Sequence, residues 1–338
     1  MNDSSLGANK RKMPSVIGTH SGSFHCDEAL GCWMLQRLES FRAATIIRSR
    51  DPEVLKDCDV VIDVGGAYDF STLRLDHHQR GFEEIIGIGG FKTKLSSAGL
   101  VYKHFGRQVI ADVLGMDMKH PDLETVYLQV YKNFIEAVDA IDNGIPQWDT
   151  SEPPRYASHT SLASRVANLN PKWNEDGSEE ILYKQFLKAV QLTGAEFQDC
   201  VEYVGGCWLP ARRHVQDALE SLSQVDVSLQ IMRLDVVCPW KEHLYQLEGE
   251  LGLSKPVLFC IYKDEREGKW RIQAVSVSSS SFENRRSMPA AWRGLRDEKL
   301  SEVSGIPGCV FCHANGFIGG NDTYEGALEM AQKSLTFE

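Results

Sequence analysis

The sequence lacks a long apolar run and an excess of basic residues. Its 338 residues contain no segment close to the roughly 18 consecutive apolar residues that a membrane-spanning helix needs, which argues against an integral membrane protein. Lys and Arg number 36 against 47 Asp and Glu, so the formal net charge is -11 at pH 7. We therefore expect no protein-wide basic surface for nucleic acid. Any polyanionic substrate must be bound by local arginines or by metal ions.

The cysteines form no paired framework, and the start of the chain lacks a secretory pattern. Nine cysteines, an odd number, are scattered from Cys26 to Cys312, which is typical of a reducing compartment. The first fifteen residues are polar and include the short basic run Lys10-Arg11-Lys12, but they contain no apolar stretch of the kind that secretory signals have. We expect an intracellular protein without a clear presequence.

The amino-acid composition is that of a globular protein, and the chain length predicts two domains. Hydrophobic residues make up 42% and charged residues 25% of the chain, and a length of 338 residues predicts about two domains of roughly 150 residues each. We expect a flexible polar tail over residues 1–13, a first domain over 14–205 that includes a helical connector, and a C-terminal α/β domain over 206–338.

The first third of the chain alternates between strand and helix patterns. Short runs rich in Val and Ile over residues 15–18, 44–47, 59–64 and 73–75 predict buried strands, and the spacing of apolar residues from Ala29 to Leu38 predicts a helix. A strand, a helix and a second strand at this spacing predict an α/β fold with a parallel sheet and right-handed crossovers.

The rest of the chain is first helical and then alternating. Residues 96–142 predict two long helices, whose apolar stripe continues through Val138 to Ile141, and a polar, proline-containing connector follows over residues 143–177. A further helical region begins at residue 179 and ends near residue 223. Strands are predicted over residues 225–237, 256–263, 269–278 and 309–313, followed by a closing helix over residues 323–335.

Acids and histidines collect where the predicted strands of the first domain end. His20 follows the first strand and leads to His25 and Asp27 at a helix start, Asp63 ends a later strand, and Asp76-His77-His78 ends the next. Ligands of open parallel sheets bind outside the carboxyl ends of the strands, so these side chains are expected to share one crevice. Each residue alone has an ordinary structural explanation, and only their ordered combination indicates a shared site.

These residue types predict divalent cations and phosphoester hydrolysis. Carboxylate oxygens combined with imidazole nitrogens suit Mn²⁺, Fe²⁺ or Co²⁺, and suit Mg²⁺ less well. Two cations that share a bridging carboxylate can activate water and bind the oxygens of a phosphoryl group. They would also make an acidic protein locally attractive to phosphate.

The ordered set resembles the DHH phosphoesterase superfamily. It consists of His20, His25-x-Asp27, Asp63, Asp76-His77-His78 and Asp139. Longer segments, at residues 18–30, 63–66, 137–144, 291–298 and 316–321, resemble the melanocyte-proliferating-gene-one family, and the resemblance extends from about residue 14 to residue 335.

The resemblance implies a fold and an activity. The fold is a parallel-sheet DHH phosphoesterase domain with a helical insertion, followed by a smaller α/β DHH-associated-like domain. The activity is metal-dependent 3′-to-5′ exonuclease action on single-stranded RNA, in RNA processing, in the nucleus and mitochondrion. His25 stands where most of the superfamily has Asp, which favours Mn²⁺ over Mg²⁺, with Co²⁺ also compatible.

The resemblance also implies roles for individual residues. One cation is expected at His20 and His25, a second at Asp27, His77 and Asp139, with Asp63 as the bridge. Asp76 and His78 are the expected catalytic residues, and His78 faces the scissile phosphate. Asp142 lies three residues after Asp139 on the same helical face and stays open as the alternative ligand.

The C-terminal domain supplies the expected substrate contacts. The segment from His313 to Asn321 is predicted to leave a strand, turn at Gly319 and Gly320, and enter a helix. Glycines beside a helix start expose backbone N–H groups that can bind a phosphate. Arg293, inside a segment shared with the family, is a further expected contact.

Two other functions stay open from the sequence. The same metals could hydrolyse a small phosphoanhydride or a short oligonucleotide, or the protein could be a non-catalytic regulatory module. The intact set of ligands argues against the second. Strand polarity, RNA against DNA preference, a cytoplasmic location and the oligomeric state, a homodimer included, are not fixed by the sequence.

Overall fold

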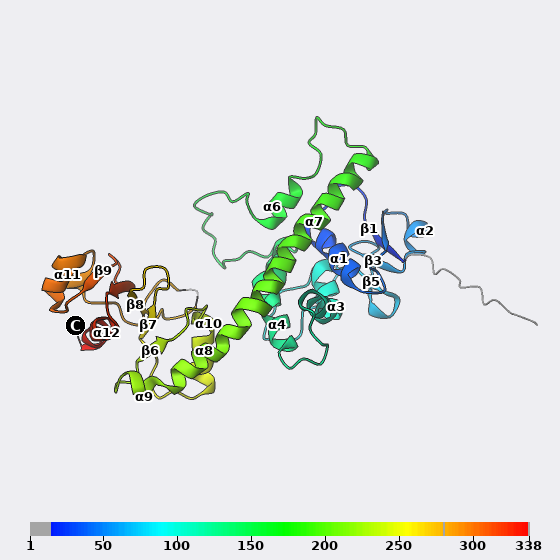
Figure 1. Ribbon diagram of the computed structural model, residues 1–338. Coiled ribbons are helices and arrows are strands. Elements are labelled where there is room, and N and C mark those ends of the chain that lie inside the picture. Colours follow the sequence, from blue (N-terminus) through cyan, green and yellow to red (C-terminus); the bar gives the residue numbers. More distant parts are fainter. Residues whose placement is uncertain (1–14, 280, 337–338) are drawn as a thin grey trace, which may run out of the picture. The chain divides into compact units, whose positions relative to one another are not determined.

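The computed structural model describes residues 15–279 and 281–336 and divides the chain into two compact units, Met1–Gly205 and Gly206–Glu338 (Figure 1). Each unit contains a five-stranded sheet with helices packed on it, so the predicted α/β class is confirmed. The tail predicted over residues 1–13 lies outside the described residues. Within the described part of the chain, no helix is both long and apolar enough to cross a membrane.

The sheet of the first unit has the order β2-β1-β3-β5-β4. Its strands are β1 (Val16–Thr19), β2 (Thr45–Arg48), β3 (Val60–Ile62), β4 (Tyr68–Asp69) and β5 (Arg74–Leu75). The four predicted strands are present and parallel to one another, as predicted. The antiparallel edge strand β4 was not predicted, because its two residues carry no apolar run.

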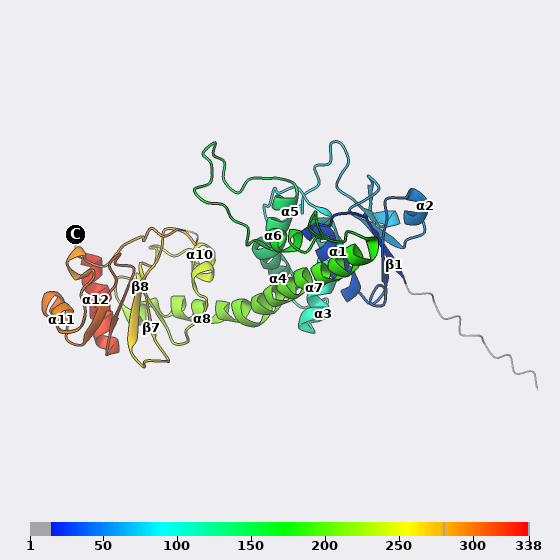
Figure 2. The ribbon, with the colours of Figure 1, turned by 90° about the horizontal axis from the view of Figure 1, so that it is seen from above.

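Helix α1 (Cys26–Arg37) lies at the centre of the first unit. Every residue from Cys26 to Leu35 is buried, because α1 packs against α3 (Ser97–Leu114), α7 (Glu179–Tyr203) and the sheet. A helix that is covered on all sides needs no polar face. Figure 2 shows α7 passing alongside α1.

The remaining helices of the first unit are α2 (Pro52–Leu55), α4 (Leu123–Val130), α5 (Glu136–Asp142) and α6 (Leu162–Ala167). A π-helical turn over Tyr131–Ile135 joins α4 to α5, so the second predicted long helix is interrupted. The turn adds residues to one helical repeat and changes the phase of the apolar stripe. Ile141, predicted to continue the buried stripe, is 52% exposed.

The sheet of the second unit has the order β6-β7-β8-β10-β9. Its strands are β6 (Ile231–Leu234), β7 (Phe259–Lys263), β8 (Trp270–Ala274), β9 (Cys309–Cys312) and β10 (Ile318–Asn321). Only β6 and β7 pair in parallel among the described strands of this unit. The predicted strand over residues 225–237 is shorter than expected, since it begins at Ile231 after a helical turn.

Helices cover both faces of this second sheet. Ile231 joins the core under α11 (Asp297–Ser304) and α12 (Tyr324–Thr336), whereas its neighbour Met232 joins the core under α8 (Leu209–Glu220) and α10 (Lys241–Glu250). Consecutive residues of a strand point to opposite faces, so the two cores lie on opposite sides of the sheet. The short α9 (Leu222–Val225) precedes β6.

The prediction that Gly319 and Gly320 form a turn is wrong. Both residues are buried in β10, between β8 and β9. A Cβ atom on Gly320 would lie 3.1 Å from the carbonyl oxygen of Trp270, so close strand packing explains the glycine. The side chain of Asn321 accepts a hydrogen bond from the Thr323 N–H at 3.0 Å and orders the entry into α12.

We predict that Gly194→Ala destabilises the first unit, although alanine favours helices over glycine by about 1 kcal/mol. A Cβ atom on Gly194 of α7 would lie 2.0 Å from the Trp33 ring of α1, so the two helices would have to separate. Urea unfolding should show a loss of about 1–3 kcal/mol. A gain in stability would contradict this packing.

The exposed neighbour Ala195 provides the control for this measurement. Ala195→Gly should cost only the difference in helix propensity, about 1 kcal/mol.

Candidate metal centre

The predicted ligands come from adjacent strand ends and one helix start. His20 directly follows β1, Asp63 directly follows β3, and Asp76 directly follows β5. Because these three strands are parallel, their carboxyl ends lie at one edge of the sheet. The buried helix α1 begins at the same edge, immediately after His25.

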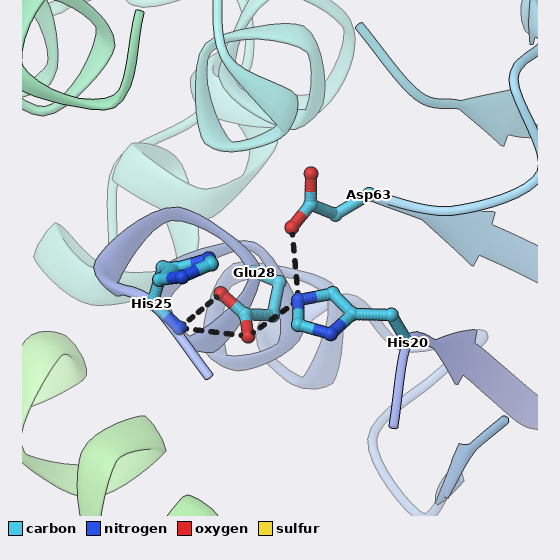
Figure 3. Close-up of side chains that lie close together, drawn as sticks. All are labelled: His20, His25, Glu28 and Asp63. Carbon is cyan, nitrogen blue, oxygen red and sulfur yellow. Dashed lines mark hydrogen bonds and ion pairs between the residues drawn. The ribbon is translucent and has the colours of Figure 1, made fainter. Parts of the chain in front are cut away.

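A first group of potential ligands contains His20, His25, Glu28 and Asp63, each with a ligand atom within 4.8 Å of the others (Figure 3). His20 Nε2 lies 3.0 Å from Glu28 Oε1 and 3.3 Å from Asp63 Oδ2. Both oxygens of Glu28 are 2.9 Å from the backbone N–H of His25, which fixes this carboxylate at the first turn of α1.

Glu28 is a ligand candidate that the sequence interpretation missed. The available signal was its position three residues after the residue that precedes α1, where a Glu side chain reaches back to the helix start. The signal is ambiguous, because most residues in that position only cap a helix. Its burial, which the sequence does not show, distinguishes it.

Two further groups extend the first. Asp63, His77 and His78 form one, and Asp27, His77 and Asp142 form the other. His77 Nε2 lies 3.4 Å from Asp63 Oδ1 and 3.1 Å from Asp142 Oδ2. The groups share Asp63 and His77, so the ligands form one continuous cluster with room for more than one cation.

Asp27 supplies the test of whether this cluster fits a cation. Its side chain is fully buried, and neither of its oxygens accepts a hydrogen bond from the residues that the structure describes. Burial, and then the negative charges of Asp63 and Asp142, raise the Asp27 pKa well above its usual range. A buried carboxylate without donors is costly, and a divalent cation removes that cost.

The imidazoles of His20 and His77 supply positive charge to the cluster. Burial alone would lower the pKa of His20, but hydrogen bonds and charge from Asp63 and Glu28 raise it to about 10. Asp142 and Asp63 likewise outweigh burial and raise the pKa of His77 to about 10. Metal binding requires neutral imidazoles, so cations would replace these protons.

Asp63 occupies a strained position between the ligand groups. Its φ is 58°, in the left-handed region that residues with a side chain rarely adopt. Burial alone would raise the pKa of Asp63, but contacts with His20 and His77 lower it below its usual range. A strained, ionised carboxylate common to two ligand groups is consistent with the bridging role expected for it.

The structure places Asp142, and not Asp139, among the potential ligands. Asp139 Oδ1 accepts hydrogen bonds from the Ser96 N–H at 2.9 Å and the Ser96 hydroxyl at 2.8 Å, and Oδ2 accepts one from Tyr131 at 3.1 Å. Burial outweighs these bonds and raises the pKa of Asp139 to about 7. These bonds connect α5 to the start of α3, and the arrangement favours the alternative ligand Asp142, so the choice between Asp139 and Asp142 stays a prediction.

Asp76 and His78, the expected catalytic residues, are hydrogen-bonded to each other. Asp76 Oδ1 lies 2.8 Å from His78 Nδ1, and Asp76 Oδ2 accepts the Gly66 N–H at 2.6 Å. An ionised carboxylate can only accept, so Nδ1 carries the proton and Nε2 is left for other partners. The His78 side chain is 61% exposed, whereas Asp76 is buried.

Arg50 is a second residue that the sequence interpretation missed. It lines a cavity of about 320 Å³ together with His20, Asp63 and His78. Arg50 Nη2 lies 3.3 Å from His20 Nδ1, and its Nε donates to the Ser21 carbonyl at 3.3 Å. Arg50 follows β2 by two residues, so the parallel sheet brings a permanent positive charge to the edge that carries the ligands.

The expected substrate contacts lie in the second unit. Arg293 and His313 are exposed, and Arg293 Nε donates to the Met288 carbonyl at 3.0 Å. His313 Nδ1 accepts the Asn315 N–H at 3.1 Å. All the grouped ligands belong to the first unit, and the substrate roles of Arg293 and His313 stay predictions.

Comparison with known proteins extends this picture. A model of the MYG1 exonuclease family, described as an uncharacterised protein family (UPF0160), matches residues 16–335. The chain belongs to this family. Human MYG1 exonuclease is 51% identical over 334 residues, which are 96% of this chain and 87% of the relative. The MYG1 protein of Dictyostelium discoideum is 47% identical over 320 residues, covering 95% and 96% of the two chains.

A solved pGpG-specific phosphodiesterase from Vibrio aligns with 95% of this chain and 97% of its own. Its TM-score is 0.29 and its sequence identity 15%, a likeness too weak to carry a conclusion. Membership of the MYG1 exonuclease family together with the partly buried cluster of potential ligands supports a metal-dependent hydrolase of phosphoesters.

We predict that Asp27→Asn stabilises the protein when metal is removed and weakens its response to Mn²⁺. The substitution removes a carboxyl group that the metal-free protein must either bury ionised or protonate against its usual pKa, so chelator-treated protein should gain about 1–3 kcal/mol of unfolding free energy. Added Mn²⁺ should raise the thermal midpoint of the wild type but hardly that of the variant. Asp57→Asn, at an exposed position, is the control.

Metal analysis separates Asp139 from Asp142. Asp142→Ala should lose bound Mn²⁺ while the metal-free protein unfolds near the wild-type temperature. Asp139→Ala should keep the metal but lose about 2–4 kcal/mol, because Ser96 and Tyr131 are left with unpaired buried donors. The reverse pattern would restore Asp139 as the ligand.

Proposed function

We propose that this protein is a two-metal 3′-to-5′ exoribonuclease that releases mononucleotides from single-stranded RNA. The observation that carries the proposal is the buried cluster around Asp27, Asp63 and His77, in which carboxylates exceed donors. The name of the human relative, an exonuclease, supports nucleic acid as the substrate. RNA, the 3′ end and a role in RNA processing follow from the family resemblance.

The first cation would be held by His20, His25, Glu28 and Asp63, and the second by Asp27, Asp63, His77 and Asp142. When bound, a pair of divalent cations activates water and stabilises the negative charge on the phosphoryl oxygens. Mn²⁺ suits this mixture of imidazole and carboxylate donors best, with Mg²⁺ and Co²⁺ as alternatives.

His78 would act at the scissile bond. Asp76 accepts a hydrogen bond from Nδ1–H and so holds the ring in one orientation, with Nε2 directed to other partners. Because its side chain is exposed at the edge of the cluster, His78 could protonate the oxygen that leaves when Nε2 also carries a proton, that is, as an imidazolium, and would then be left with the Nδ1 proton alone. Asp76 is thereby a positioning residue for His78.

The two units would have different roles, hydrolysis and RNA binding. The first unit is the DHH phosphoesterase domain that performs hydrolysis, and the second is a DHH-associated-like domain that holds the RNA through Arg293 and His313. With a net charge of -11, phosphate binding depends on the cations and on local groups such as Arg50. We further propose that the protein acts in the nucleus and in the mitochondrion.

An end-labelled 20-mer, as RNA and as DNA, tests the activity with Mn²⁺ and with chelator. We expect Mn²⁺-dependent shortening of RNA from its 3′ end. His78→Ala should lower the rate by about 10²–10⁴-fold, the usual contribution of a general acid, without changing metal content. His120→Ala, which replaces an exposed histidine of the same unit, should match the wild type.

Three results would contradict the proposal. Endonucleolytic products would exclude an exonuclease, and shortening from the 5′ end would reverse the polarity. Hydrolysis restricted to pyrophosphate or dinucleotides would favour the small-substrate alternative.

A further inference from the structure

We infer that a cavity between α5 and α6 binds the nucleobase of the nucleotide whose phosphate lies at the ligand cluster. This inference rests on the proposed function and assigns a site to one part of the substrate. The cavity has a volume of about 410 Å³, within the range of about 300–1,000 Å³ that is usual for small-ligand sites.

The cavity begins at the ligand cluster itself. His25, His78 and Asp142 line it, and each of them belongs to a group of potential metal ligands. His25 and His78 also line the cavity that contains Arg50. A phosphate bound at the cluster would therefore have an open cavity directly beside it for the attached nucleoside.

The far walls of the cavity are apolar and come from two helices. Val138 and Ile141 lie three residues apart on α5, and Ala163 and Ala167 lie four residues apart on α6, so each pair shares one helical face. Ile141 is 52% exposed, an unusual position for a large apolar side chain beside charged groups. A flat base placed between these faces would cover it.

The small side chains of α6 keep the space open. Ala163 and Ala167 project one carbon each, whereas the larger Val166 is fully buried and does not line the cavity. Ser164, between the two alanines, brings a hydroxyl group to the lining and can hydrogen-bond a base edge. The cavity thus combines apolar faces with a few polar groups, as nucleobase sites do.

The α6 wall is attached to the ligand loop. Asn170, three residues after α6, accepts the Phe24 N–H through Oδ1 at 3.0 Å and donates through Nδ2 to the Phe24 carbonyl at 3.0 Å. Phe24 is fully buried and immediately precedes His25. This double hydrogen bond, across 146 residues of sequence, fixes the wall relative to a metal ligand.

Calorimetric titration of the full-length, Mn²⁺-loaded protein tests the inference with three probes: adenosine 5′-monophosphate, ribose 5-phosphate and inorganic phosphate. The wild type should bind the nucleotide about fivefold or more tightly than ribose 5-phosphate, which is the lower end of what contacts with a base contribute. Ala167→Phe, which fills the cavity from an exposed position, should remove this preference. Its affinity for inorganic phosphate and its metal content should not change.

Two further variants complete the experiment. Ile141→Ala removes one apolar side chain from the cavity wall and should also weaken nucleotide binding. This variant tests the inference if Ala167→Phe does not fold. Ala195→Phe adds the same ring at an exposed position of α7 and should bind like the wild type. Equal wild-type affinity for the nucleotide and for ribose 5-phosphate would overturn the inference, as would unchanged nucleotide binding in Ala167→Phe or Ile141→Ala.

A different result would contradict the proposed function. If the wild type cleaves no RNA with Mn²⁺, the exonuclease assignment is wrong, whereas the preference for a base is measured by binding alone. A protein that prefers the nucleotide but cleaves no RNA would keep the cavity assignment and lose the exonuclease. A protein that cleaves RNA without a preference for the base would do the opposite.

Discussion

The main constraint on the structure of the first unit is the buried carboxyl group of Asp27, which must be neutralised if the unit is to be stable. Asp27 lies on the first turn of α1, which is buried from Cys26 to Leu35, has no hydrogen-bond donor among the described residues, and faces the negative charges of Asp63 and Asp142. Such an arrangement opposes folding unless positive charge is supplied. The protonated imidazoles of His20 and His77 supply part of it, and divalent cations would supply the rest.

Several interactions outside the cluster keep these charges close together. Gly194 lets α7 approach Trp33 on α1, Asp139 connects α5 to the start of α3, and Asn170 holds the backbone before His25. None of them supplies a potential ligand. Each fixes an element that does, so the position of the cluster is set by packing and backbone hydrogen bonds around it.

The sequence predicted the parts of the site that depend on strand ends. Because β1, β3 and β5 are parallel and short, acids and histidines that directly follow them must lie at one edge of the sheet, and His20, Asp63 and His77 do. Glu28 was missed because its spacing equally fits a helix cap. Arg50 was missed because a single arginine after a strand carries no chemical pattern.

The differences between the sequence predictions and the structure have local physical causes. Asp139 and Asp142 share a helical face by spacing, and the π-helical turn before α5 changes the phase that a regular helix would give. The same change brings Ile141 to the surface, where it lines the cavity beside the ligands. Gly319 and Gly320 were expected in a turn, since a strand without apolar side chains shows no alternating pattern.

Anomalous diffraction from crystals of the full-length protein grown with Mn²⁺ tests the central claim most directly. The account predicts two manganese peaks, one surrounded by His20, His25, Glu28 and Asp63, the other by Asp27, Asp63, His77 and Asp142. A map with no peak at these residues, or with the second peak coordinated by Asp139, would contradict it.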